Sequence, residues 1–129
     1  MTGHAAEFEA VAGVIADYFD GLHHSDTGRL RSVFHPKAQY VSATDGTLLY
    51  RTVEEYLPVV DARPSPASRG EARADRILSI EFAGPFTARA TLNCAIGDKF
   101  FTDWLTFIKV DDRWQVISKV FHHEPRKVA

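Results

Sequence analysis

The sequence has 129 residues, a formal net charge of -2 at pH 7, 45% hydrophobic residues and 25% charged residues. This length and composition are typical of one globular domain, residues 1–129, with enough chain to bury a sizeable core. The small net charge and the lack of a basic run argue against nucleic acid or an anionic membrane as partner. The sequence holds no apolar run near the roughly 18 residues of a membrane span, and its N-terminus lacks a signal-peptide layout. We therefore expect a cytoplasmic protein.

The N-terminal segment predicts two helices. Apolar residues recur with helical spacing over residues 6–22, which predicts a first helix with one buried face. Ser25 or Asp26 can cap a second, shorter helix. That helix should end at His35, because Pro36 disfavours helical geometry in the residue before it.

A short hairpin and a third helix follow. Residues 37–43 read as a strand and residues 48–50 as a short return strand. Thr52 and Glu55 form the sequence pattern of a capping box, which predicts a helix over residues 53–61.

The second half of the chain predicts strands only. Residues 76–82 and 86–96 are strand-like, and a hairpin spans residues 100–122. The polar pair Asp111-Asp112 divides this hairpin into two arms rich in aromatic and β-branched residues. Helices first and strands later indicate an α+β fold of three N-terminal helices packed on a mainly antiparallel sheet.

The hairpin has a register that follows from its loop. If Asp111-Asp112 is a two-residue loop, Val110 pairs with Arg113 and every later pair follows by counting. One face, expected to point inward, then carries Phe101, Asp103, Leu105, Phe107, Trp114, Val116, Ser118, Val120 and His122. The other face carries Thr102, Trp104, Thr106, Ile108, Gln115, Ile117, Lys119 and Phe121.

The neighbouring strands give an independent check of this register. Counting through the turn at Gly97-Asp98 places Leu92 opposite Asp103 and Ala90 opposite Leu105, so that apolar faces meet. A three-residue loop at 84–86, or a bulge, would put the apolar residues of the preceding strand on the same face: Leu78, Ile80 and Phe82.

Two stretches resemble a known superfamily. YFDGLHHSDTGRLRSVFHPKAQY at 18–40 and FTDWLTFIKVDDRWQVISKVF at 101–121, with the element order, resemble the nuclear-transport-factor-2-like (NTF2-like) superfamily. The likeness is greatest to its SnoaL-like polyketide-cyclase and lumazine-binding branches. The resemblance implies a cone in which a curved sheet wraps a long helix around an internal pocket, often dimerised through the sheet. It also implies a small heteroaromatic ligand. The acid–base residues of ketosteroid-isomerase-like enzymes do not map onto this sequence, and none is carried over.

Asp103 and His122 are the candidate catalytic residues. A carboxylate among Phe101, Leu105 and Leu92 would lose its hydration and could act as a general base. In the predicted register His122 lies diagonal to Asp103, within side-chain reach. The alternatives are a structural hydrogen-bonded pair or a solvated Asp103. With a hairpin loop one residue longer, Asp103 would instead form an ion pair near Lys119 and His123.

The expected function is binding of a small apolar or heteroaromatic molecule in an internal pocket. Small residues at positions 88, 90 and 94 would leave volume there. The alternatives are a cofactor-independent isomerase, dehydratase or cyclase that uses Asp103 and His122, and a dimeric partner-binding domain without catalysis. The pocket should be lined by Tyr18, Tyr40, Tyr56, Leu92, Phe101, Leu105, Trp114 and Val120.

Other chemistry is not expected. The six histidines show neither i,i+4 helical spacing nor HxH strand spacing, so we predict no metal site. The sequence has no glycine-rich phosphate loop, GxSxG or CxxC, and we predict no cofactor. The single cysteine, Cys94, lies in a strand among apolar residues and reads as a buried, inert thiol.

The outer face of the hairpin predicts a homodimer. Four apolar residues would be exposed there, and the three helices are already needed to cover the inner face. A second copy could cover this patch by a two-fold contact. The interface residues would be Trp104, Ile108, Ile117 and Phe121.

Overall fold

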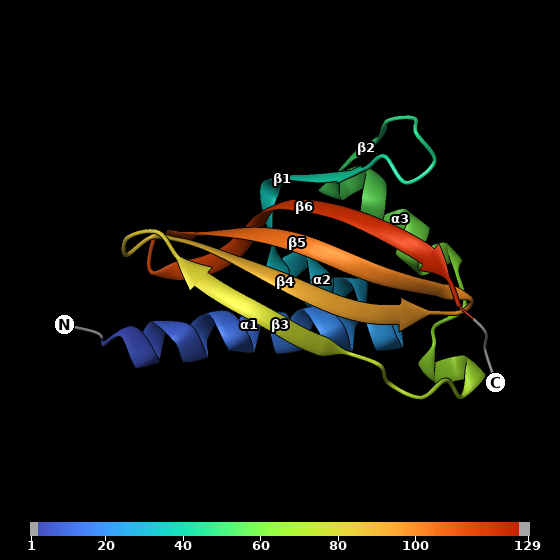
Figure 1. Ribbon diagram of the computed structural model, residues 1–129, viewed down its shortest axis with the longest axis horizontal. Helices are drawn as coiled ribbons and strands as arrows, with labels where there is room; N and C mark the ends of the chain where they lie inside the picture. Colours follow the sequence, from blue (N-terminus) through green and yellow to red (C-terminus); the bar gives the residue numbers. More distant parts are fainter. Residues whose placement is uncertain (1–2, 127–129) are drawn as a thin grey trace.

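In the computed structural model, which describes residues 3–126, three α-helices cover one face of a six-stranded sheet (Figure 1). Figure 1 looks onto the other face, so that α2 is seen behind the strands. We call the helix-covered face the inner face and the opposite one the outer face. The helices are α1 (His4–His24), α2 (Thr27–Val33), α3 (Val53–Ala62) and the short 3-10 helix η1 (Ala67–Arg69). No helix in residues 3–126 is both long and apolar enough to cross a membrane.

The sheet has the strand order β2-β1-β6-β5-β4-β3. All neighbouring pairs are antiparallel except β1 and β6, which run parallel. The strands are β1 (Phe34–Ser42), β2 (Leu49–Thr52), β3 (Arg76–Phe82), β4 (Thr87–Ile96), β5 (Lys99–Val110) and β6 (Arg113–Pro125). This arrangement confirms the predicted α+β architecture.

The helix ends follow the predicted caps. Ser25 ends α1 in the left-handed conformation (φ 49°), and the Asp26 side chain accepts a hydrogen bond from the Arg29 N–H at the start of α2. Thr52 and Glu55 form both bonds of the predicted capping box. Helix α2 ends two residues earlier than predicted, because Phe34 already begins β1.

The predicted register between β4 and β5 is confirmed. Leu92 lies opposite Asp103 and Ala90 opposite Leu105. The predicted three-residue connection between β3 and β4 is also present, since Phe82 lies opposite Ala88. Leu78 is the exception: the register shifts at this residue, and its side chain is exposed.

The hairpin of β5 and β6 begins as predicted and then changes register. Asp111 and Asp112 both have positive φ, 52° and 60°, as a two-residue type I′ loop requires, and Val110 pairs with Arg113. The register then shifts between Thr106 and Phe107, where Ile117 on β6 has no partner on β5. Ile117 is therefore the extra residue of a β-bulge.

The bulge exchanges the two faces of the last half of β6. Because side chains alternate, one inserted residue moves every later side chain to the opposite face. Asp103 lies opposite Phe121, and Thr102 opposite His122. The predicted face assignment is therefore wrong for Ser118, Lys119, Val120, Phe121 and His122.

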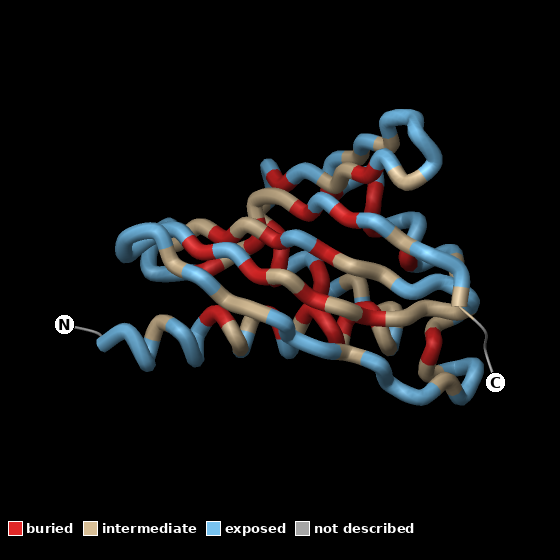
Figure 2. The backbone as a smooth tube through the Cα atoms, viewed as in Figure 1, coloured by how far each residue is buried: buried red, intermediate tan, exposed pale blue. Residues whose placement is uncertain are grey.

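The core lies between the helices and the inner face. Figure 2 shows buried backbone concentrated in the middle of the sheet and on the helix behind it. The small residues of β4 are less than 5% exposed and belong to the same buried cluster as the α1 stripe. The cluster members from these two elements are Val11, Ile15, Tyr18, Phe19, Leu22, Ala88, Ala90, Leu92 and Cys94.

Candidate functional site

Asp103 is a fully buried carboxylate on the inner face. It is 0% exposed, although its strand neighbours on that face, Phe101 and Leu105, are apolar. The Tyr18 hydroxyl, from the buried stripe of α1, donates a hydrogen bond to Asp103 Oδ2 over 2.5 Å. Asp103 Oδ1 is buried and has no hydrogen-bond partner among residues 3–126. A buried acceptor without a donor is costly, which marks this oxygen as a candidate contact for a ligand.

Lys119 lies beside this pair, inside a cage of aromatic rings. The bulge turns its side chain inward, where the residue is only 4% exposed. Its Nζ lies 5.2 Å from the Tyr18 ring centroid, 5.0 Å from that of Tyr40 and 5.3 Å from that of Tyr56. The Phe121 ring centroid is 5.1 Å away. Ammonium groups at this distance from aromatic faces are held by cation–π attraction.

We call Tyr18, Tyr56, Asp103 and Lys119 the buried polar cluster. Burial acts to lower the pKa of Lys119, but Tyr56, Asp103 and Tyr40 outweigh it and raise this pKa above its ordinary value. Burial and then the Asp103 charge raise the pKa of the Tyr18 phenol well above 10.0. Burial also raises the pKa of Tyr56, against the opposing effect of Lys119. At neutral pH the cluster therefore keeps neutral phenols beside an ammonium group.

Cys94 lies near the cluster as an inert thiol. It is buried, and burial followed by the Asp103 charge raises its pKa far above the ordinary value. A thiol with a raised pKa is a poor nucleophile at neutral pH.

His122 does not lie near Asp103. It pairs with Thr102 on the outer face, and its side chain is 57% exposed. Its ring nitrogens face Thr44 Oγ1 and Glu124 Oε1, each at 3.5 Å. The predicted Asp103–His122 pair is therefore wrong, and the physical reason is the bulge at Ile117. The register of the alternative, which brings Asp103 near Lys119 and His123, is present, although the extra residue lies in the strand rather than in the loop. The ion pair that the alternative predicted for Asp103 is not formed among the described residues.

The predicted pocket-lining residues divide into three groups. Tyr18, Tyr56 and Leu92 are buried around the cluster, and Leu105 is buried beside it. Tyr40 and Phe101 are half-buried. Trp114 is buried far along the hairpin, where its Nε1–H donates to Glu7 Oε2 over 2.6 Å, and Val120 is on the outer face with 44% exposure. Val120 is thus a wrong assignment, again because of the bulge.

Four further aromatic residues form the rim of the cluster: Tyr40, Phe101 and His123 are half-buried, and Phe121 is buried. The ring of Tyr40 stacks on that of Tyr56 with 4.3 Å between centroids. Phe121 lies between Tyr40 and Phe101, with centroid separations of 4.8 Å and 5.8 Å. His123 contacts Phe101 at 5.4 Å. Together with Tyr56, these rings form one continuous aromatic layer beside Lys119.

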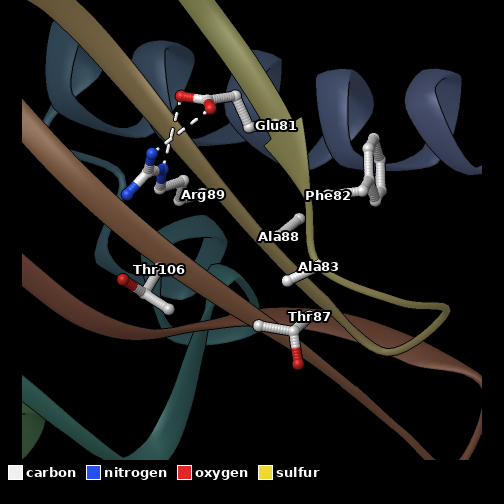
Figure 3. Close-up of a pocket in the computed structure, with 7 residues that line it drawn as sticks. All are labelled: Glu81, Phe82, Ala83, Thr87, Ala88, Arg89 and Thr106. Carbon is white, nitrogen blue, oxygen red and sulfur yellow. Dashed lines mark hydrogen bonds and ion pairs between the residues drawn. The ribbon is translucent and has the colours of Figure 1, made fainter.

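Two surface grooves lie on the outer face, away from Asp103 and Lys119. One has a volume of about 500 Å³ and lies by β3 and β4 (Figure 3). Figure 3 shows Arg89 beside Glu81 in this groove, joined by hydrogen bonds of 3.3 and 3.2 Å. These charges compensate each other and are exposed. A second groove of about 450 Å³ lies beside Trp104 and His122 on the same face.

The predicted interface residues also divide. Trp104 is 66% exposed on the outer face, as predicted. Ile108 and Ile117 are half-buried, and Ile117 is the bulge residue. Phe121 is 6% exposed on the inner face and touches Tyr40, so its assignment to the outer face is wrong.

The sequence reasoning missed Lys119 and the pairing of Tyr18 with Asp103. One signal was available for the pair: a buried tyrosine hydroxyl needs a hydrogen-bond partner, and so does a buried carboxylate. For Lys119 the signal was only the alternative register. No group of three or more His, Cys, Asp or Glu side chains in residues 3–126 is placed to hold a metal ion.

Comparison with known proteins agrees with this architecture. Residues 6–122 match the family described as putative lumazine-binding. The chain is similar to the aldolase FrzH of a Cladobotryum species, with 25% identity over 122 residues and 95% of each chain covered.

Solved structures give the same result for the fold. An NTF2-like protein of unknown function from Shewanella baltica OS155 is 25% identical, with a TM-score of 0.87 over 97% of this chain and 99% of that one. An NTF-2-like protein of unknown function from Silicibacter pomeroyi DSS-3 is 20% identical, with a TM-score of 0.83 over 95% and 100% of the two chains. Because the family match spans residues 6–122 and the fold agrees, the chain belongs to the putative lumazine-binding family of the NTF2-like superfamily.

Proposed function

We propose that this protein is a cofactor-independent enzyme that removes a proton from the carbon next to a carbonyl group of a small molecule. The observation that carries the proposal is Asp103 Oδ1, a buried carboxylate oxygen without a hydrogen-bond donor among residues 3–126. Tyr18 occupies the other carboxylate oxygen, so Oδ1 is the oxygen left to accept a proton.

Each member of the buried polar cluster has a role in this chemistry. Asp103 is the base, and the Tyr18 hydrogen bond fixes the orientation of its carboxylate. Lys119 is the positive charge beside it, held by the surrounding rings without an ion-pair partner among the described residues. A fixed positive charge stabilises the oxyanion that develops on the substrate oxygen.

The proposed step is balanced without a cofactor. The C–H bond breaks, its proton goes to Asp103 Oδ1, and its electron pair moves to the carbonyl oxygen to give an enolate. In a β,γ-unsaturated carbonyl compound the enolate is a dienolate, and return of the proton from Asp103 to its γ-carbon gives the conjugated isomer. Addition of the enolate carbon to an aldehyde forms a C–C bond, and the resulting alkoxide takes the proton back from Asp103.

The similarity to a protein named as an aldolase supports this reaction class, because an aldol addition needs such an enolate. At 25% identity the two proteins can differ in activity, so the reaction class is a proposal for this chain. Ligand binding without turnover is the second candidate, and the half-buried rings of Tyr40 and Phe101 favour it, since they offer flat apolar surfaces to a heteroaromatic molecule.

The test is exchange of α-protons for deuterium, followed by NMR, in a panel of ketones and oxo acids that includes phenylacetone and phenylpyruvate. The wild-type chain should accelerate exchange, and Asp103→Asn should lower the rate by roughly 100-fold or more, as expected for loss of a general base. His122→Gln is the matched control on the outer face and should leave the rate unchanged. Equal rates for wild type and Asp103→Asn on every compound would refute the proposal. Saturable binding without exchange would favour the second candidate.

A further inference from the structure

Arg63 is a second cation near the buried polar cluster. It follows α3 directly, two helical turns beyond Tyr56. Its Nε is buried and has no hydrogen-bond partner among residues 3–126. Several other arginines of the chain have carboxylate partners, for example Arg29 with Asp17 at 2.8 Å and Arg73 with Asp20 at 2.7 Å.

Lys119 likewise has no hydrogen-bond acceptor among the described residues. It is 4% exposed, and none of the described residues accepts a hydrogen bond from its Nζ. Aromatic faces attract an ammonium group but do not replace the oxygen acceptors that it has in water. An oxygen acceptor supplied by a ligand would therefore stabilise this ammonium group.

The two cations act on the same buried groups. The charges of Lys119 and Arg63 both oppose the raised pKa of Tyr56, and both oppose that of Cys94. Asp103 opposes them at both groups, and Asp75 opposes them at Cys94 but is already paired with Arg73. Lys119 and Arg63 are therefore two cations within electrostatic range of the cluster that have no ion pair with a carboxylate among the described residues.

We propose that the substrate is an oxo acid whose carboxylate is bound by Arg63 and Lys119 at the rim of the buried polar cluster. This inference rests on the proposed function, because it names the class of carbonyl compound on which Asp103 acts. A planar guanidinium with Nε available matches a carboxylate through two parallel hydrogen bonds. Such a ligand would bring a negative charge to these two cations and supply the missing acceptors, while its keto group lies beside Lys119.

The test compares two ligands that differ in charge, phenylpyruvate and phenylacetone, by calorimetric titration and by the shift in unfolding temperature. Wild type should bind phenylpyruvate roughly 10-fold or more tightly than phenylacetone, and Arg63→Gln should remove most of that preference, as expected for one charged hydrogen-bonded contact. Arg89→Gln makes the same change on the outer face (Figure 3) and should leave both affinities unchanged. Arg63→Lys keeps the charge but not the planar fork, and should weaken phenylpyruvate binding less than Arg63→Gln does.

Equal affinity of wild type for the two ligands would overturn the inference, and so would an undiminished preference in Arg63→Gln. If Arg63→Gln does not fold, the wild-type preference and Arg63→Lys decide the matter. Failure here is distinguishable from failure of the proposed function. Asp103-dependent exchange of phenylacetone protons without a carboxylate preference would reject the oxo acid and keep the reaction. Arg63-dependent binding of phenylpyruvate without proton exchange would keep the oxo acid as the ligand and reject the reaction.

Discussion

The hydrogen bond between Tyr18 and Asp103 should make a large contribution to stability. Tyr18→Phe removes only one oxygen atom, so it opens almost no cavity, but it leaves both oxygens of a fully buried carboxylate without a donor. A hydrogen bond to a charged group contributes about 1.5–3 kcal/mol, and we expect Tyr18→Phe to lower the free energy of unfolding by about 2–3 kcal/mol. That is a sizeable part of the total of about 5–15 kcal/mol for a domain.

Urea unfolding of four proteins measures this contribution: wild type, Tyr18→Phe, Asp103→Ala and the double variant. The effects of the two single substitutions should not add, with a coupling free energy of about 1.5–3 kcal/mol. Tyr50→Phe is the matched control, because Tyr50 is 48% exposed, and it should change the free energy by less than about 0.5 kcal/mol. Additive effects, or a loss in Tyr18→Phe no larger than in the control, would show that water rather than Tyr18 satisfies Asp103.

Two further predictions concern pH and assembly. Folding raises the pKa of Tyr18 above 10.0 and that of Lys119 above 10.5, so the folded state holds these protons more tightly than the unfolded chain. The resulting stability is complete below about pH 10 and is lost as the pH rises further. Urea unfolding should therefore show a steep loss of stability at alkaline pH, and Tyr18→Phe should make this loss shallower. A decline equally steep in Tyr18→Phe would contradict the assignment. We also propose that the outer face joins two copies of the chain, because Trp104 and Val120 are 66% and 44% exposed there. In light scattering, Trp104→Arg should give monomers or insoluble protein. Leu48→Arg, at a site 76% exposed in the β1–β2 connection, should leave the dimer intact. A wild-type chain that is monomeric at micromolar concentration would refute the dimer.

The sequence was sufficient for features that depend on neighbouring residues. Caps at Asp26 and Thr52, and loops at Gly97-Asp98 and Asp111-Asp112, have residue types that favour one local geometry, and the pairing of Leu92 with Asp103 follows by counting from such a loop. The inward position of Asp103 was therefore predictable.

The partners of Asp103 were not predictable in the same way. Ile117 is a β-branched residue that suits a regular strand as well as a bulge, so the shift at this residue has no distinctive residue type. The parallel pairing of β1 with β6 joins distant parts of the chain and leaves no local pattern either. Both features depend on how the whole sheet packs against the helices.

The bulge at Ile117 has a consequence for how this fold acquires new chemistry. If Ile117 instead paired with Thr106 and the strand had no bulge, Lys119 and Phe121 would turn outward and His122 would turn toward Asp103. An aspartate–lysine centre would become an aspartate–histidine centre without the replacement of any side chain. In a sheet of this kind, the gain or loss of a bulge in a strand is therefore as direct a source of functional divergence among relatives as substitutions in the site itself.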